Sequence, residues 1–185
     1  MDTENEIRFL EVDEEELIKK LETLGAEKIL DHAKQVRYVY DLNPKQPNKW
    51  IRLRTNGTKT TLTVKELQNT TVDGTKECEI EVSDFEKTNL LLNELGFLAR
   101  SKQENIRTLY KLFNVEVAID SWPKIPTYVE LEGKTKEEIF FVGKILNLDA
   151  QKLTTLDVAS IYQSYGIDVL KIKDLTFGDK NNGVN

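Results

Sequence analysis

Charged and apolar residues alternate along most of the segments that have the composition of β-strands, and this period of two is the strongest constraint on the fold. In the segments 4–8, 51–54 and 77–81, charged residues fall at every second position. Successive side chains of a strand point to opposite faces, so each segment has one charged face and one face for packing. An antiparallel sheet with one face in solvent gives the same alternation, and each segment by itself fits that alternative.

The charged faces differ from an ordinary solvated face in two ways. Their residues are Glu, Asp, Arg and Lys rather than Thr, Ser and Gln, and the two signs of charge are segregated. Carboxylates form pairs at positions 4 and 6, 79 and 81, and 130 and 132, whereas cations gather at positions 52, 54 and 65. Like carboxylates two positions apart on one strand lie roughly 6–7 Å apart and repel each other unless a cation lies between them. The pattern therefore favours a binding site over a solvated surface.

Hydrophobic periodicity, helix caps and turn residues predict eight strands and four helices. The strands are expected at residues 4–12, 34–41, 49–55, 60–67, 77–82, 105–113, 115–121 and 128–132, and the helices at residues 14–24, 85–95, 136–146 and 155–165. Asp13 and Asp84 are suited to cap the first two helices, and a glycine follows each of these helices. An Asn-Gly pair at 56–57 predicts a hairpin turn between two of the strands.

The first two strand–helix units repeat at a constant separation. Asp13 and Asp84 are 71 residues apart, and Arg37 and Arg107 are 70 residues apart. Coincidence between two ordinary units is the alternative, but we interpret the repeat as pseudo-twofold symmetry with about four strands in each half. Eight such strands can close into a barrel with the charged faces inside. The apolar residues then expected to pack outward under the helices are Ile7, Phe9, Ile51, Leu53, Cys78 and Ile80.

Composition and rare residues exclude several classes of function. A net charge of −6 argues against nucleic acid as the main partner. The single cysteine, Cys78, rules out a disulfide framework. The single histidine, His32, excludes a His-rich zinc site, and we expect it to be a surface residue in a polar connection after a helix. No glycine-rich phosphate-binding loop occurs, so side chains would have to hold any bound phosphate.

Length and hydropathy bound the organisation of the chain. The 185 residues fit one domain, which we expect at residues 1–177, with residues 178–185 as a disordered tail. The first residues lack the basic and apolar regions of a secretion signal, and no apolar run approaches the ~20 residues that a membrane span needs. We therefore expect a cytoplasmic protein with no membrane partner.

The segregated charges point to a particular chemistry. Paired carboxylate oxygens are hard ligands suited to Mg²⁺ or Mn²⁺. Arginine forks and lysine ammonium groups suit phosphate oxygens. A divalent metal together with Arg and Lys is the usual means of neutralising a transferring phosphoryl group. The charged residues thus indicate a metal-dependent enzyme that binds the phosphates of a small molecule.

Five segments resemble, in order, the motifs of the CYTH family, the triphosphate-tunnel proteins that include class IV adenylyl cyclases, thiamine triphosphatases and inorganic tripolyphosphatases. Residues 4–8 resemble the E-x-E-x-K signature, residues 51–54 with 63–65 the basic hairpin, and residues 77–84 the central acidic strand. Arg107 with 117–120 and then 128–133 resemble the closing strands. The resemblance implies an α+β fold, in which an eight-stranded antiparallel β-barrel forms a charged tunnel with helices packed outside.

By position, the resemblance assigns the carboxylates to a Mg²⁺ or Mn²⁺ ion and the cations to phosphate. The metal carboxylates are Glu4, Glu6, Glu130 and Glu132, with Glu79, Glu81 and Asp120 as second choices. The phosphate contacts are Arg8, Arg52, Arg54, Lys65 and Arg107, with Lys111 as a weaker candidate. Arg8 and Lys65 are also the residues expected to act in catalysis.

The function that the resemblance implies is metal-dependent hydrolysis of inorganic tripolyphosphate or of a nucleoside or thiamine triphosphate. The alternatives are a class IV adenylyl cyclase, which makes cyclic AMP from ATP, and a non-catalytic barrel that binds a nucleotide or polyphosphate. Arg8 replaces the signature lysine and stays protonated. Asn105 stands where relatives often carry Lys or Arg, and residues 122–126 replace a glycine-rich turn associated with cyclases. The expected partner is a small-molecule triphosphate, and a homodimer is left open.

Overall fold

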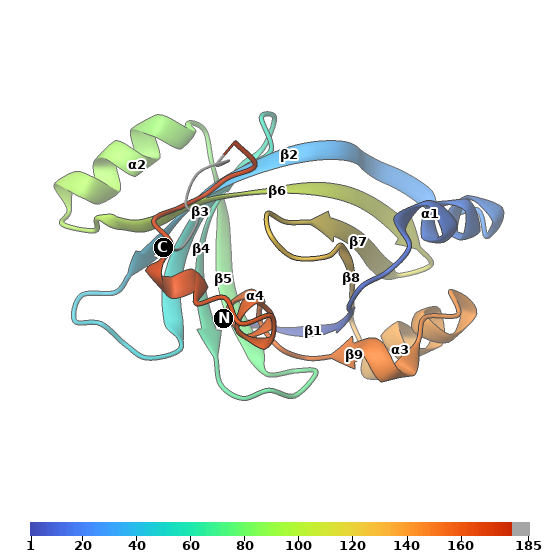
Figure 1. The fold of residues 1–185 in the computed structure, drawn as a ribbon. Helices are drawn as coiled ribbons and strands as arrows, with labels where there is room; N and C mark the ends of the chain where they lie inside the picture. Colours follow the sequence, from blue (N-terminus) through green and yellow to red (C-terminus); the bar gives the residue numbers. More distant parts are fainter. Residues whose placement is uncertain (179–185) are drawn as a thin grey trace.

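A computed structural model describes residues 1–178 and shows a β-barrel with helices around it (Figure 1). The barrel strands are β1 (Asp2–Phe9), β2 (Glu27–Asp41), β3 (Lys49–Thr55), β4 (Thr60–Leu67), β5 (Thr75–Val82), β6 (Ala99–Leu112), β7 (Val115–Ser121) and β8 (Tyr128–Gly133). The helices are α1 (Glu14–Thr23), α2 (Phe85–Glu94), α3 (Lys136–Ile145) and α4 (Val158–Ser164), and the short elements are η1 (Ala150–Lys152), β9 (Leu153–Thr154), η2 (Val169–Lys171) and β10 (Asp174–Leu175).

The eight long strands form a closed antiparallel barrel. Their order is β6-β2-β3-β4-β5-β1-β8-β7, and pairing of β7 with β6 closes the ring. The short β9 pairs with the end of β1, and β10 runs parallel to β6. The expected eight-stranded antiparallel barrel with external helices is confirmed. Residues 179–185, which include nearly all of the expected tail, lie outside the described part of the chain.

The strand order has the pseudo-twofold symmetry that the repeated spacing predicts. Exchanging β1–β4 with β5–β8 maps the cyclic order onto itself, and α1 and α2 follow equivalent strands. The Asp13 and Asp84 carboxylates accept hydrogen bonds from the third backbone N–H of α1 and α2, as N-caps do. Gly25 and Gly96 take positive φ angles after these helices, a conformation that glycine adopts without steric cost.

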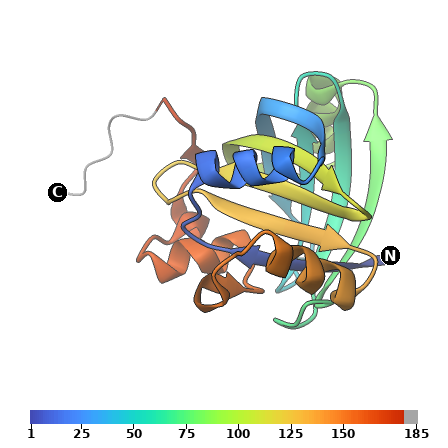
Figure 2. The same ribbon diagram turned by 90° about the vertical axis from the view of Figure 1, so that its right-hand side faces the viewer.

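Three apolar clusters lie between the barrel and its helices. Figures 1 and 2 show α1 and α3 on one side of the barrel and α2 on the opposite side. Leu21 of α1 and Ile139 of α3 join the outward residues of β1, β7 and β8 in the largest cluster. Leu92 of α2 packs on the outward side chains of β3, and Tyr162 of α4 packs on Trp122. None of the helices in residues 1–178 is long and apolar enough to cross a membrane.

The outward face of β5 differs from the expectation. Ile7, Phe9, Ile51 and Leu53 are buried under the helices as predicted, but Cys78 is exposed and Ile80 is 56% exposed. The prediction that Cys78 and Ile80 lie in the core is therefore wrong. The alternation of residues places both side chains correctly on the outer face, but the outer face of β5 is left exposed at these two positions.

The ends of several elements also differ from the expectation. β2 begins at Glu27, seven residues before the predicted start, and β6 begins at Ala99 rather than residue 105. Register shifts interrupt the pairing of β2 with β6 near Leu30 and Ala33, so the period of two is broken there. His32 lies in this irregular part of β2 with a φ angle of 46° rather than in a connection, and its side chain is exposed as expected. The helix expected at 155–165 is shorter, since α4 begins after an Asp157 cap.

Candidate active site

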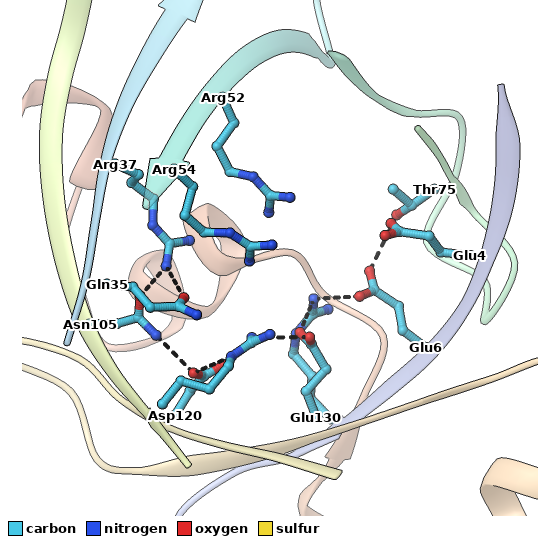
Figure 3. Close-up of polar contacts among 12 residues, drawn as sticks. Glu4, Glu6, Gln35, Arg37, Arg52, Arg54, Thr75, Asn105, Asp120 and Glu130 are labelled. Atoms are coloured by element: carbon cyan, nitrogen blue, oxygen red, sulfur yellow. Dashed lines mark hydrogen bonds and ion pairs between the residues drawn. The ribbon is translucent and has the colours of Figure 1, made fainter. Parts of the chain in front are cut away.

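The inward faces of the barrel strands line a cavity of about 700 Å³. Side chains of α4 and η2 also line this cavity, so the C-terminal segment forms part of its wall. Because inward side chains alternate with outward ones, the charged residues singled out at every second position meet in this space. Figure 3 shows Arg37, Arg52 and Arg54 on one side of the cavity and Glu4, Glu6 and Glu130 on the other.

Carboxylates of β1 and β8 form the acidic wall, which we define as Glu4, Glu6, Glu130 and Glu132. Glu6 and Glu132 are directly opposite each other in the pairing of β1 with β8. Lys65 Nζ lies 2.8 Å from Glu4 Oε2 and is its ion-pair partner. Burial raises the pKa of Glu4 above its usual range despite this lysine. Burial and the neighbouring Glu130 and Glu4 raise the pKa of Glu132 to about 8.

Arg8 lies between two members of the acidic wall. Its Nη2 is 2.8 Å from Glu6 Oε2 and 2.6 Å from Glu130 Oε2, and its Nη1 donates a hydrogen bond of 2.9 Å to the carbonyl oxygen of Leu156. Against the effect of burial, the two carboxylates raise the pKa of Arg8 further above its ordinary value. Likewise, Arg8 and Arg107 outweigh burial and hold the pKa of Glu130 well below its usual range. Arg8 is therefore a fixed positive charge that joins two glutamates to the segment before α4.

Cations of β2, β3 and β4 form the basic wall, which we define as Arg37, Arg52, Arg54 and Lys65. Arg52 pairs with Glu79 at 3.3 Å and lies 3.9 Å from Glu77, and Arg54 lies 3.8 Å from Glu79. Against the effect of burial, a 2.7 Å hydrogen bond from Thr63 and the charge of Arg54 lower the pKa of Glu79. Arg52, and then burial, lower the pKa of Arg54, since like charges and desolvation both disfavour its cation.

Arg107 of β6 is held by carboxylates on both sides. Its Nη2 is 2.5 Å from Asp120 Oδ2 and 3.3 Å from Glu130 Oε1, and its Nε donates to Asp120 Oδ1 at 2.9 Å. Asn105 Nδ2 also donates to Asp120, at 2.8 Å, and Asn105 and Asp120 are fully buried. Asp120 is thus a structural anchor for Arg107 behind the cavity wall.

The sequence profile of the CYTH domain matches residues 2–165, which is most of the chain. The chain belongs to the CYTH family. CYTH proteins are in general triphosphate-processing enzymes with a triphosphate-tunnel fold. A search of curated protein sequences finds no match.

Solved structures share this fold. The PH1012 protein from Pyrococcus horikoshii OT3 is 26% identical, with a TM-score of 0.72, and the alignment covers 83% of this chain and 96% of that one. A Vibrio parahaemolyticus protein described as a "putative adenylate cyclase" is 11% identical, with a TM-score of 0.75 and coverage of 88% and 98%. A Hippeastrum protein described as having a dominant triphosphatase activity is 14% identical, with a TM-score of 0.59 and coverage of 93% and 100%. The last two likenesses concern the fold alone.

Most of the residues expected to form the CYTH site line the cavity. The lining includes Glu4, Glu6, Arg8, Arg52, Arg54, Lys65, Glu79, Arg107, Glu130 and Glu132. Three expected residues do not line it. Asp120 lies behind the wall. Glu81 is exposed and pairs with Lys59. Lys111 is exposed too; it lies on the same face of β6 as Arg107 and is paired with Glu116 of β7.

Several further charged residues that the sequence did not assign to the site also line the cavity, among them Arg37, Glu77 and Glu116. In the sequence, only the internal repeat distinguishes Arg37, as the counterpart of Arg107. Glu77 belongs to the run of three alternating carboxylates on β5, and its Oε2 lies 3.2 Å from Lys65 Nζ.

The acidic wall is the part of the cavity with the oxygen donors that a divalent cation needs. Among residues 1–178, no three His, Cys, Asp or Glu side chains are grouped closely enough to hold a metal ion as they stand. Arg8 and Lys65 occupy part of the glutamate oxygens, whereas Glu132 has no ion-pair partner in the described chain. Besides burial, the neighbouring carboxylates raise the pKa of Glu132, so negative charge is in excess around it. All the donors are hard oxygens. The acidic wall therefore fits Mg²⁺ or Mn²⁺ in charge and in donor type.

Proposed function

We propose that this CYTH protein is a divalent-metal-dependent hydrolase of a triphosphate. The observation that carries the proposal is the opposition of the basic wall and the acidic wall across one cavity. A triphosphate with a bound metal presents the complementary arrangement, because its phosphate oxygens need cations and its metal needs carboxylates. A carrier of apolar ligands would need an apolar lumen instead.

The residues of the cavity have distinct roles in this proposal. Arg52, Arg54 and Lys65 bind phosphate oxygens, with Arg107 at the side of the cavity. Glu4, Glu6, Glu130 and Glu132 would hold Mg²⁺ or Mn²⁺, which when bound supplies neutralisation of the phosphate charge. Arg8 keeps its proton between two carboxylates, so it positions Glu6 and Glu130 and does not act as a base. Glu79, Glu81, Asp120 and Lys111 are left out of the binding roles.

The reaction that follows is attack of water on the terminal phosphorus of the triphosphate. A P–O bond forms to the water oxygen, which releases a proton to solvent, and the P–O bond to the bridging oxygen breaks. Inorganic tripolyphosphate thus gives pyrophosphate and orthophosphate. The fixed cations of the basic wall stabilise the charge that develops on the leaving oxygen.

Product analysis tests the proposal. The protein is incubated with tripolyphosphate and, separately, with ATP in Mg²⁺ or Mn²⁺, and the products are separated by ion-exchange chromatography. We expect orthophosphate from at least one substrate and no turnover in excess chelator. Glu132→Gln should lower turnover at least tenfold, while Glu94→Gln on the exposed face of α2 should not change it. Formation of cyclic AMP and pyrophosphate from ATP would instead identify a cyclase, and binding without turnover would identify a non-catalytic barrel.

A further inference from the structure

Arg37 differs from every other cation that lines the cavity. Each of the other lining cations has a carboxylate oxygen within 4.0 Å, whereas Arg37 has none among residues 1–178. These other cations are Arg8, Lys45, Lys49, Arg52, Arg54, Lys65, Arg100 and Arg107. Its side chain is nevertheless buried, with only 6% of its surface exposed, and its Nε has no hydrogen-bond partner in the described chain. A buried charge without a counter-charge costs several kcal/mol. The ligand-free protein therefore retains a cation that something anionic would stabilise.

Neutral groups hold Arg37 in place. Its Nη2 donates to Gln35 Oε1 at 3.2 Å and to Asn105 Oδ1, and its guanidinium lies 4.4 Å from the centre of the Trp122 ring. Figure 3 shows Gln35 and Asn105 below the Arg37 guanidinium, with Arg54 beside it. Amide oxygens and an aromatic face orient an arginine without neutralising it. The guanidinium is thus fixed in direction while its charge remains uncompensated.

The pseudo-twofold symmetry of the barrel makes the missing carboxylate informative. Arg37 of β2 corresponds to Arg107 of β6, and the residue directly opposite each arginine on the next strand can be compared. Asp120 lies opposite Arg107 and neutralises it, but Arg54 lies opposite Arg37. Like charges directly opposite on one face destabilise a sheet. One half of the barrel therefore has a closed ion pair where the other half has two adjacent cations.

We propose that Arg37 is a phosphate-binding residue that, together with Arg54, holds one phosphate group of the bound triphosphate. This inference rests on the proposed function, because it names a further ligand of the same substrate. Two guanidinium groups on neighbouring strands can share the oxygens of one phosphate, whose negative charge then takes the place that Asp120 has in the other half. Burial, together with Arg52 and Arg107, lowers the pKa of Arg37 to about 9, which agrees with a cation that lacks its counter-charge.

The test compares Arg37→Gln with the wild type in two measurements. Titration calorimetry with sodium tripolyphosphate in excess EDTA measures binding to the cations alone. We expect Arg37→Gln to raise Kd at least tenfold, equivalent to about 1.4 kcal/mol, and to leave the Tm of the ligand-free protein unchanged or higher. Lys34→Gln is the matched control, because Lys34 is on the same strand but faces outward and pairs with Glu104 at 2.8 Å. Its Kd should equal that of the wild type.

The outcomes separate this inference from the proposed function. Wild-type affinity in Arg37→Gln, with turnover intact, would overturn the role of Arg37 and leave the hydrolase standing. Weakened binding in Arg37→Gln, with no turnover by the wild type, would support Arg37 and refute the hydrolase. Absence of tripolyphosphate binding by the wild type would refute both. If Arg37→Gln does not fold, Arg37→Lys is measured in its place. Weaker binding by Arg37→Lys at an unchanged Tm would support the proposal. If Arg37→Lys does not fold either, Arg37 has a structural role and the proposal is overturned.

Discussion

At the scale of single residues, Glu132 is the carboxylate whose state should respond most to pH and to metal. Burial and the neighbouring carboxylates raise its pKa to about 8 in the folded, ligand-free protein, against an ordinary value of 4.5 for a glutamate. Between these two values the folded state binds more protons than the unfolded state, so stability is full below pH 4.5 and falls as the pH rises through 8. This loss should be visible in the Tm of the ligand-free wild type.

Glu132→Gln should remove that dependence on pH. We expect the ligand-free variant to be more stable than the wild type at pH 8 by on the order of 1 kcal/mol, roughly 2–4 °C in Tm, and to differ little at pH 5. Mg²⁺ should reverse the ranking at pH 8, because only the wild type has the carboxylate that the ion neutralises. Thermal denaturation at both pH values, with and without Mg²⁺, measures this. A parallel loss of stability with pH in both proteins would assign the dependence to other groups.

At the scale of elements, β5 has a charged inner face and an outer face that is exposed at Cys78 and Ile80. Ile80 on this face is 56% exposed, whereas Leu53 on β3, beneath α2, is fully buried. Ile80→Thr should change the free energy of unfolding by no more than about 0.5 kcal/mol, because threonine suits a strand and little apolar area is lost. Leu53→Ala should cost about 2–5 kcal/mol through lost burial and the cavity that remains. Urea denaturation of the two variants measures the contrast, and equal losses would show that the outer face of β5 is covered.

The same contrast shows what the sequence can predict about these elements. The alternation correctly assigned the side of the strand on which Ile80 and Leu53 lie, and it placed the bounds of β3, β4 and β7 as observed. It could not tell which outward faces the helices cover, since that depends on how α2 packs. It also failed at the start of β2 and β6, where register shifts break the period of two.

The alternation of residues also predicts the charged site, but only in part. Inward residues at every second position identify the wall residues from local pattern, and most of them line the cavity. The residues two positions before and after Arg37 are the uncharged Gln35 and Val39, so no alternation of charges marks it. Its importance comes from the absence, among residues 1–178, of a carboxylate within ion-pair distance, which is a property of the tertiary structure. Glu81 and Lys111 fit the pattern, but both are exposed and neither lines the cavity.

At the scale of the whole molecule, the backbone pairing of the barrel and the repulsion between its cavity charges have opposite effects on the stability of the fold. The closed hydrogen-bonded ring keeps like charges together inside the cavity, as with Arg52 and Arg54, although like charges repel. A ligand that supplies the opposite charges binds the folded state and not the unfolded chain, so it stabilises the fold by mass action. The fold should therefore be most stable with the ligand whose charges match both walls.

Tripolyphosphate with Mg²⁺ should accordingly raise the Tm more than orthophosphate with Mg²⁺. At a free ligand concentration of about 100 times Kd the stabilisation is about 2.7 kcal/mol, or roughly 5–10 °C for a chain of this size. Orthophosphate can engage only part of the basic wall at one time, so its shift should be smaller, with pyrophosphate between the two. Sulfate at matched ionic strength separates specific binding from screening of the cavity charges. Scanning fluorimetry over a series of concentrations gives the three shifts, and equal shifts for tripolyphosphate and orthophosphate would contradict a cavity in which Arg37, Arg52, Arg54 and Lys65 together hold a chain of three phosphates.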